Sequence, residues 1–369
     1  MKLEALRAER IRNLKDIDLR LPAGLTLVGG GNGQGKTSLL EAAYLLGTGR
    51  SFRTRKLDEL ICWKNGPMSV VGRVSSRRGE IQLAVEIDRP DRSLLVNGAK
   101  RGLEDFLGRL DVIDLTANRM GVLRGAPEER RRFLDRGIVG LDPAFLRILG
   151  EYRRVLQQRN ALLRRGTGGN GVSTQLDAWD ERLVAAAGPL CRERRRYADR
   201  LGEKLATIGP ELLPDGQEPR LRHRPSPPEL ADTPEERLTE LLGDRIARCR
   251  GRDREMGHTT EGPHRDELSV ELEGIDLRKF GSAGQVRAAM IALKLGKLSL
   301  LREERGEAPL FLMDDFDTDL DDARMEALAG YLGRAGCQAL IATSKEDWIG
   351  RLTVAELELR MKNGVARVA

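Results

Sequence analysis

Residues 30–37 of the chain read Gly-Gly-Asn-Gly-Gln-Gly-Lys-Thr, and this stretch decides which fold the rest of the sequence has to form. An apolar run at residues 24–28 precedes it and a helical pattern at residues 36–46 follows, which is the setting that the phosphate-binding pattern G-x-x-x-x-G-K-[ST] requires. Glycines let backbone N–H groups wrap a polyphosphate, and the positive end of the following helix adds to the attraction. We expect Lys36 to reach the β- and γ-phosphates and the Thr37 hydroxyl to bind Mg²⁺. The residues predicted to line the nucleotide here are Gly30, Gly31, Asn32, Gly33, Gln34, Gly35, Lys36, Thr37 and Ser38.

A second element of the same chemistry lies near the other end of the chain. Residues 309–315 read Pro-Leu-Phe-Leu-Met-Asp-Asp, a short apolar strand that ends in two acids. Asp314 is the candidate second ligand of Mg²⁺. Asp315 is the candidate catalytic carboxylate that orients or deprotonates the attacking water, with Lys36 as the other catalytic residue. The alternative is a solvated pair of acids after a core strand.

A third motif separates the classes of phosphate-loop protein. Residues 282–285 read Ser-Ala-Gly-Gln and stand before a helical pattern, upstream of the acidic strand. In ABC-type ATPases an S-x-G-Q segment at a helix N-terminus presents its serine and amide groups to the γ-phosphate bound by the opposite subunit. Ser282, Gly284 and Gln285 are therefore predicted nucleotide-binding residues. Alone, such a tetrapeptide is usually a helix cap, but its order and spacing relative to the other two motifs favour the ABC interpretation.

Two further stretches refine that class. Residues 318–321, Thr-Asp-Leu-Asp, occupy the place of the D-loop. Thr343 and Ser344 stand where ABC transporters usually carry a switch histidine. The absence of a histidine there weakens the interpretation as a transporter subunit.

The composition limits the remaining choices. The chain has 369 residues, of which 40% are hydrophobic, and a formal net charge of +6. Its four cysteines are widely spaced and include no CxxC pair, which is typical of reduced thiols. The sequence starts without an apolar signal core and contains no apolar run of about 18 residues, so we expect a cytoplasmic protein without a membrane span.

The order of the patterns predicts an α/β fold, namely a P-loop NTPase of the ABC-type ATPase head with an inserted helical lobe. Strand-like runs dominate the first part of the chain, long helical patterns follow, and strands return near Thr259. We assign residues 1–115 to the N-terminal part of the ATPase head and residues 116–255 to the helical second lobe. Residues 256–369 are assigned to the C-terminal part of the head.

Several stretches resemble the RecF family of bacterial recombination mediators, and the resemblance runs through nearly the whole chain. The most specific are Gly262-Pro263-His264-Arg265-Asp266 and Arg130-Arg131-Arg132-Phe133-Leu134-Asp135; others are Ile11-Arg12-Asn13 and Gly49-Arg50-Ser51-Phe52-Arg53. The resemblance implies ATP and Mg²⁺ as cofactors, a head-to-tail homodimer formed on ATP, and slow DNA-dependent ATP hydrolysis. It also implies binding to gapped DNA or single-strand/double-strand junctions, and work with RecR and RecO in loading RecA.

The resemblance adds Arg12 and Asn13 to the predicted nucleotide-binding residues, and it departs from the family at three places. Ala117-Asn118-Arg119 replaces a Pro-Glu-Asp-like stretch, so the contact equivalent to the Q-loop stays unassigned. Ala283 replaces a glutamine, and the D-loop reads Phe-Asp-Thr-Asp-Leu-Asp at residues 316–321. For His264 and Arg265, a structural role that braces the strand leading to Ser282 is favoured over a catalytic one.

Arginines cluster at residues 119–132, 153–165 and 192–196, mostly within the predicted helical lobe. On a shared face they would neutralise DNA phosphates and release counterions. The alternative is an ordinary charged helix face, because glutamates are interleaved. Aromatic residues are only 4% of the chain, so backbone-directed binding is expected rather than base stacking. The predicted DNA-contacting residues are Arg50, Arg53, Arg130, Arg131 and Arg132.

Three other functions compete with a DNA-dependent ATPase. A transporter ATPase subunit would need a membrane partner. A long-armed structural ATPase of the SMC type would need sustained heptads, and the inserted segment is interrupted by Pro and Gly. A P-loop kinase of small molecules would transfer phosphate to a metabolite and would not respond to DNA.

Overall fold

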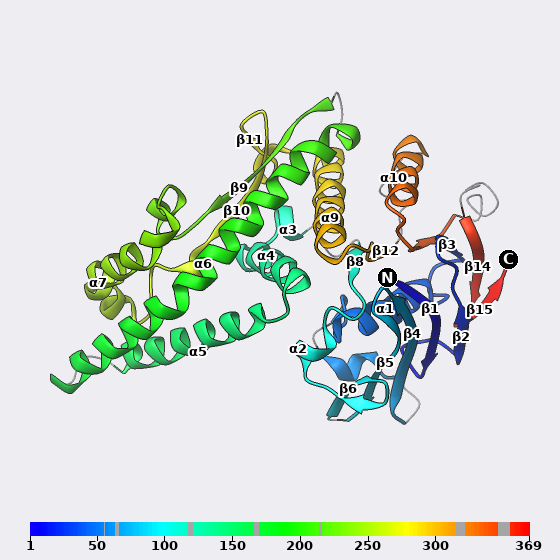
Figure 1. The fold of residues 1–369 in the computed structure, drawn as a ribbon, viewed down its shortest axis with the longest axis horizontal. Coiled ribbons are helices and arrows are strands. Elements are labelled where there is room, and N and C mark those ends of the chain that lie inside the picture. The colour runs from blue at the N-terminus through cyan, green and yellow to red at the C-terminus, as the bar shows by residue number, and fades with distance from the viewer. Residues whose placement is uncertain are drawn as a thin grey trace. The chain divides into compact units, whose positions relative to one another are not determined.

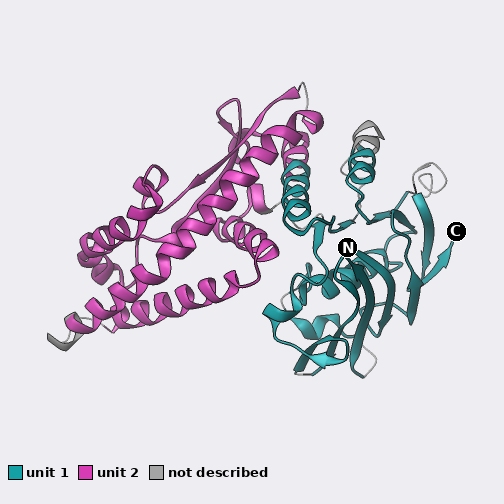
Figure 2. Ribbon diagram, in the orientation of Figure 1, with its two compact units in different colours: residues 1–119, 291–369 teal, residues 120–290 magenta. Residues whose placement is uncertain are grey.

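The computed structural model describes residues 1–54, 56–62, 66–89, 91–116, 121–165, 170–213, 216–314, 322–345 and 355–369. The chain divides into two compact units, coloured separately in Figure 2. The first unit, which we call the head, comprises residues 1–119 and 291–369. The second, which we call the arm, comprises residues 120–290 and is inserted in the sequence of the head.

One six-stranded sheet of the head combines strands from both ends of the chain. Its strands are β3 (Leu25–Gly29), β8 (Val112–Leu115), β12 (Leu310–Met313), β13 (Ala339–Thr343), β14 (Ala355–Lys362) and β15 (Val365–Val368). They run in the order β15-β14-β3-β13-β12-β8, and all neighbours are parallel except β14 and β15. The residues of β3, β12 and β13 are all buried, as expected of parallel strands covered on both faces.

The second sheet of the head is antiparallel. Its strands are β1 (Lys2–Glu9), β2 (Ile17–Arg20), β4 (Met68–Ser76), β5 (Gly79–Asp88), β6 (Asp91–Val96) and β7 (Ala99–Lys100), in the order β2-β1-β4-β5-β6-β7. Buried positions alternate with more exposed ones along β4, so one face of this sheet packs on the core. Two short elements also belong to this part of the head. The 3-10 helix η1 (Leu57–Leu60) precedes β4, and the helix α2 (Leu103–Phe106) follows β7.

Helix α1 (Lys36–Thr48) lies between the two sheets of the head (Figure 1). Its Leu39 and Leu40 share one core cluster with Leu6 of the antiparallel sheet and with Leu310 and Leu340 of the parallel sheet. Eleven of its residues are buried, and each fully buried leucine contributes about 1.5–3 kcal/mol. The core therefore fixes the start of α1, directly after the loop at residues 30–35.

The arm consists mainly of helices. They are α3 (Gly121–Arg124), α4 (Pro127–Leu141), α5 (Phe145–Arg164), α6 (Asn170–Leu212), α7 (Leu238–Met256) and α8 (Leu277–Phe280), with the short helices η4 (Pro228–Ala231), η5 (Glu235–Arg237) and η6 (Pro263–Arg265). Helices α5 and α6 run side by side, as Figure 1 shows. Helix α9 (Ala283–Arg305) begins in the arm and ends in the head, and α10 (Asp322–Arg334) belongs to the head.

The arm also contains a three-stranded antiparallel sheet, and this sheet corrects one predicted boundary. Its strands are β9 (Pro219–Arg224), β10 (Glu267–Leu272) and β11 (Ile275–Asp276), in the order β11-β10-β9. We predicted that the head resumes at residue 256, because strands return there. Strand β10 instead pairs with β9 of the arm, and the division between the units falls at residue 290, within α9.

Three arginines form ion pairs in the interior of the arm. Arg159 is fully buried and donates to Asp180 and Asp253, both at 2.7 Å. Arg194 donates to Asp135 at 2.9 Å and Asp266 at 2.8 Å. Arg130 is 2% exposed and is paired through two nitrogens with Glu267. Such pairs join α4, α5, α6, α7 and β10, and removing one partner of a buried pair costs about 3–5 kcal/mol.

The α/β fold predicted from the sequence is confirmed, and the expected strand at residues 24–28 and helix at residues 36–46 correspond to β3 and α1. Strands β7, β8, β9 and β11 were not predicted. None of the helices within the described ranges has the length and apolar character that a membrane crossing demands.

Candidate nucleotide-binding site

The loop at residues 30–37 has positive φ angles at three glycines, one of which is Gly33 with a φ of 75°. Gly30 has a φ of 145° and Gly35 a φ of 108°, values that residues with a side chain rarely adopt. A Cβ on Gly30 would also lie 2.5 Å from the backbone oxygen of Met361. This winding leads into α1 at Lys36, so the N–H groups of the first helical turn are available to an anion.

The side chain of Lys36 folds over this loop. Its Nζ donates to the carbonyl oxygens of Gly30 at 2.6 Å and Gly31 at 3.0 Å, and the residue is only 5% exposed. An ammonium has three donors, so a phosphate oxygen can take the third or replace a carbonyl. The positive charge thus lies inside the loop, where we predicted it.

Thr37 and Asp314 meet at the end of strand β12. The hydroxyl Oγ1 of Thr37 donates to Oδ1 of Asp314 at 3.1 Å. Two neighbouring ligands of an octahedral Mg²⁺, each at 2.0–2.1 Å from the ion, are about 2.9 Å apart. The two oxygens therefore fit a magnesium ion that keeps its other positions for water and phosphate.

Asn13 braces the phosphate loop from one side. Its Nδ2 donates to the carbonyl of Gly33 at 2.8 Å, and its Oδ1 accepts from the hydroxyl of Ser38, also at 2.8 Å. From the other side, Oε1 and the backbone carbonyl of Gln34 accept from the backbone N–H groups of Asn363 at 2.6 Å and Gly364 at 3.0 Å. The turn between β14 and β15 thus supports the loop.

Glu41 is a candidate functional residue that the sequence analysis missed. It is fully buried on α1, and its carboxylate accepts two hydrogen bonds from Arg12, at 2.9 and 3.1 Å. It also accepts a short hydrogen bond from the hydroxyl of Ser51, and Nη1 of Arg53 lies 3.8 Å away. A lone acid on an otherwise apolar helix was the available signal. Glu41 holds two guanidinium groups beside the phosphate loop.

Arg53 and Arg12 both line the pocket that opens in front of the loop. Arg53, which we predicted as a DNA contact, has a partly exposed side chain at the rim of this pocket, and its role in DNA binding stays a prediction. Arg12 has a φ of 54°, a left-handed backbone that is strained for a residue with a side chain. Such strain is often found where a side chain has to be aimed at a ligand.

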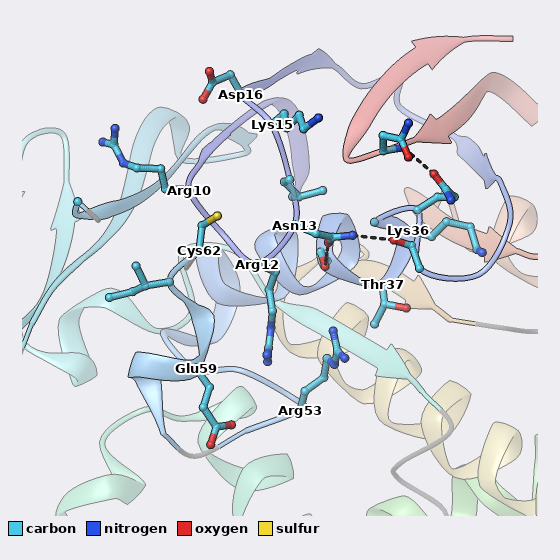
Figure 3. A pocket seen from close by; sticks show the side chains of 18 of the residues that line it. Arg10, Arg12, Asn13, Lys15, Asp16, Lys36, Thr37, Arg53, Glu59 and Cys62 are labelled. Carbon is cyan, nitrogen blue, oxygen red and sulfur yellow. Dashed lines mark hydrogen bonds between the residues drawn. The ribbon is translucent and has the colours of Figure 1, made fainter. Parts of the chain in front are cut away.

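The pocket has a volume of about 1740 Å³, larger than the roughly 300–1,000 Å³ of most ligand sites. Figure 3 shows Lys36 and Thr37 on one side of it and Arg10 and Cys62 on the other, with Asn13 between them. The phosphate loop therefore occupies one part of the pocket and leaves room for the rest of a nucleotide.

The predicted signature residues form a turn in the arm, which we call the signature turn, Gly281 to Gln285. Ser282 and Gln285 make a reciprocal helix cap: the backbone N–H of Gln285 donates to Oγ of Ser282 at 3.2 Å, and that of Ser282 donates to Oε1 of Gln285 at 2.9 Å. Ser282 is exposed at the start of α9. The motif is thus a helix cap, and its serine hydroxyl lies at the surface.

Both ring nitrogens of His264 have hydrogen-bond partners within the arm. Its Nε2 lies 3.0 Å from the carbonyl oxygen of Thr259, which can only accept, so Nε2 carries the hydrogen. Its Nδ1 then accepts from the hydroxyl of Tyr152 at 2.7 Å. Burial lowers the pKa of His264 to about 4, so the ring is neutral at pH 7. Both nitrogens are used in bracing α5 against the segment before β10.

The arginines predicted to contact DNA differ in their surroundings. The prediction that Arg130 contacts DNA is wrong, because its buried guanidinium is held by Glu267 and cannot reach a phosphate. Arg131 donates to the carbonyl of Asp266 at 3.0 Å, and Arg132 is paired with Glu128. Arg50 is exposed.

Other predicted positions lie outside the described residues, namely Asp315, the D-loop at 316–321 and Ala117-Asn118-Arg119.

A phosphate loop before α1, then a Ser-x-Gly-Gln cap at the start of α9, then an aspartate at the end of a parallel strand of the same sheet define, in this order along the chain, an ABC-type ATPase. The family model of the RecF/RecN/SMC N-terminal domain matches residues 2–365. The chain is 37% identical to the DNA replication and repair protein RecF of Myxococcus xanthus over 349 residues, which cover 93% of this chain and 91% of that protein. It is 30% identical to RecF of Oceanobacillus iheyensis over 368 residues, 99% of this chain and all of that one. The chain belongs to the RecF family.

Solved structures give the same result. The recombination mediator protein RecF of the RecFOR pathway, in its RecF-ATP form, is similar with a TM-score of 0.89 and 28% identity, over 100% of this chain and 97% of that one. An Smc head bound to the C-terminal winged-helix domain of ScpA is similar in fold alone, with a TM-score of 0.59 and 16% identity, over 100% of this chain and 97% of that chain.

Proposed function

We propose that the protein is an ATP-dependent DNA-binding protein of recombinational repair and replication restart. Two copies join head to tail on ATP at gapped DNA or at a single-strand/double-strand junction, promote loading of the recombinase, and separate after slow, DNA-dependent hydrolysis. One observation carries the proposal: the chain has both a phosphate loop with a paired Thr37 and Asp314 and an exposed signature serine, Ser282.

The phosphate loop holds the triphosphate of ATP. The Nζ of Lys36 leaves the carbonyls of Gly30 and Gly31 for the β- and γ-phosphates. Thr37 and Asp314 hold Mg²⁺, which neutralises phosphate charge. Arg12, kept in place by Glu41, adds a second fixed positive charge. Asp315 orients or deprotonates the attacking water, as positioning and charge are most of what phosphoryl transfer requires.

The signature turn of one copy closes over the nucleotide of the other. Ser282 is exposed, and its hydroxyl can donate to a γ-phosphate oxygen while still accepting from the N–H of Gln285. The free N–H end of a helix favours that contact electrostatically. ATP thereby joins two copies, and loss of the γ-phosphate releases them.

DNA binding is supported by the family and by the exposed arginines that remain once the buried ones are removed. Arg153 and Arg154 on α5 have side chains 61% and 73% exposed, and Arg164 and Arg165 at its end are also exposed. Their surface ion pairs are weak and leave them able to meet phosphates. The binding is directed at the backbone of the nucleic acid in the cytoplasm, at the nucleoid.

The partners follow from the relatives. RecF of the solved complexes is named as a mediator in the RecFOR pathway. We infer that this chain works with RecR and RecO and, through them, with RecA.

The test measures ATPase rate and oligomeric state with and without gapped DNA. Wild-type protein should dimerise only with ATP, and DNA should raise the hydrolysis rate. Ser282→Arg should bind ATP as a monomer but not dimerise, because the larger cation blocks the contact with the other copy. Ala247→Arg, at an exposed position of α7, adds the same charge elsewhere on the arm as a control. A nucleotide-saturated wild type that stays monomeric with gapped DNA would refute the proposal.

A further inference from the structure

Two residues outside the signature turn hold it in place. Arg124, the last residue of α3, donates from Nη2 to the carbonyl oxygen of Gly281 at 2.9 Å. Gln217, in the segment between α6 and β9, accepts at Oε1 from Nε2 of Gln285 at 3.1 Å. Both lie in the arm, as does the turn. Neither is part of the Ser-x-Gly-Gln pattern.

The peptide group that joins Gly281 to Ser282 is held directly by Arg124 and indirectly, through the side chain of Gln285, by Gln217. A peptide group is planar, so its C=O and N–H turn together. Arg124 holds the oxygen of this group, and its N–H donates to Oε1 of Gln285 at 2.9 Å. The peptide cannot rotate unless both contacts break.

The carboxamide of Gln285 has only one orientation that satisfies its neighbours. The backbone nitrogen of Ser282 can only donate, so Oε1 must face it and Nε2 is left for Gln217. Without Gln217, Nε2 loses its acceptor in the arm, and only the hydrogen bond from the N–H of Ser282 still holds the carboxamide. Gln217 therefore keeps the cap of α9 in its working form.

The signature turn has little space to move as a whole. A Cβ on Gly281 would lie 2.6 Å from the backbone oxygen and 2.8 Å from Cδ2 of Leu277, so the turn packs closely on α8. A released peptide would rotate in place and direct its carbonyl dipole away from Arg124. A carbonyl oxygen that turns toward a bound phosphate repels it, whereas an N–H attracts it.

We propose that Arg124 and Gln217 are positioning residues of the ATP site that two copies form together. Arg124 fixes the Gly281–Ser282 peptide, and Gln217 fixes Gln285, so that the hydroxyl of Ser282 meets the γ-phosphate held by a second copy. This inference rests on the proposed function. It also moves Arg124 out of the group of arginines that we assigned to DNA.

The experiment measures ATP-driven dimerisation by sedimentation, without DNA, for Arg124→Ala, Gln217→Ala and the double variant. Binding of a fluorescent ATP analogue to the monomer is measured separately. Each single variant should weaken dimerisation about tenfold or more, the size of one lost hydrogen bond to a charged or fully oriented group, with monomer binding unchanged. The double variant should lose less than the product of the two losses, because both residues act on one peptide.

Three comparisons make the result decisive. Arg124→Lys keeps a donor and should recover part of the dimerisation, which also covers the case that Arg124→Ala does not fold. Arg237→Ala removes an exposed arginine of the arm that pairs with Glu240 and should dimerise as wild type does. Normal dimerisation of Arg124→Ala and Gln217→Ala beside a monomeric Ser282→Arg would overturn the positioning role alone. Normal dimerisation of Ser282→Arg would instead overturn the proposed function.

Discussion

The hydroxyl oxygen of Thr37 lies 3.1 Å from a carboxylate oxygen of Asp314, although 277 positions separate the two residues in the sequence. Strand order explains this proximity. Strand β3 leads into the phosphate loop and β12 ends next to Asp314, with only β13 between them in the sheet. The proposed magnesium site therefore depends on parallel strands whose residues come from both sides of the inserted arm.

Asp314→Asn should slow ATP hydrolysis by about tenfold to a hundredfold and move its Mg²⁺ dependence to higher concentration, because a neutral amide oxygen binds the ion less strongly. The hydrolysis rate is measured across a Mg²⁺ titration. Thr48→Ala is the control, since it removes a hydroxyl that caps the far end of α1. An unchanged Mg²⁺ dependence in Asp314→Asn would rule out its role as a ligand.

Glu41→Gln should lower the free energy of unfolding by about 2–3 kcal/mol and weaken ATP binding. The substitution leaves the guanidinium of Arg12 without its carboxylate in a partly buried position. Urea unfolding and nucleotide titration measure the two effects. Glu59→Gln alters an exposed carboxylate that lines the same pocket and should change neither by much. If both variants bind ATP with equal affinity, Glu41 does not contribute to the nucleotide-binding site.

Stability should fall as the pH drops from 6.5 toward 4. Burial lowers the pKa of His264 to about 4 in the folded protein, whereas the unfolded chain has the ordinary value of 6.5. The neutral ring thus contributes stability that is fully present above pH 6.5 and is lost on acidification, by about 3 kcal/mol in total. Urea unfolding at several pH values should show a shallower decline in His264→Gln than in His258→Gln. Identical slopes would contradict this account.

Cys62 should be protected from thiol reagents by ATP, because it lines the pocket that holds the nucleotide. Cys249, a partly exposed thiol on α7, serves as the control within the same molecule. Burial raises the pKa of Cys337 to about 12, so that thiol should react slowly with or without ATP. Mass spectrometry after timed alkylation measures each site. Equal rates at Cys62 with and without ATP would show that the nucleotide lies elsewhere.

DNA affinity should fall steeply with salt, with a log–log slope of about −0.9 for each phosphate contact. Removing the exposed arginines Arg164 and Arg165 should reduce that slope, because each contact releases counterions. Arg130→Met should instead lower stability and leave the slope unchanged, since its guanidinium is internal. Fluorescence anisotropy with duplex and gapped DNA from low to high salt gives the slopes. A flat salt response in the wild type would show that contacts between arginines and phosphates do not drive DNA binding.

The sequence predicts the parts of this molecule that depend on contiguous residues. The loop at residues 30–37, the acidic strand and the Ser-x-Gly-Gln cap are all local patterns with a local physical cause. The pairing of β9 with β10 could not be predicted, because α7 lies between the two strands in the sequence and β9 is flanked by prolines. Its consequence, the boundary at residue 290 rather than 255, was missed for the same reason.

The clustering of arginines in the sequence predicted the roles of individual arginines poorly. Arg130, Arg159 and Arg194 look like their exposed neighbours in the sequence, and only the acids that fold against them make them internal. Arg124 belongs to the basic cluster at residues 119–132, yet its guanidinium contacts the signature turn within the arm. Arg53, named separately as a DNA contact, lines the pocket in front of the phosphate loop.

The support that Asn363 and Gly364 give to Gln34 has a consequence for how the protein is made. The loop emerges from the ribosome 329 residues before the hairpin on which it rests. At the usual speed of translation that delay is on the order of 20–60 s. Until the β14–β15 hairpin has been synthesised, the phosphate loop lacks this support, so we expect nucleotide binding to become effective only after that point.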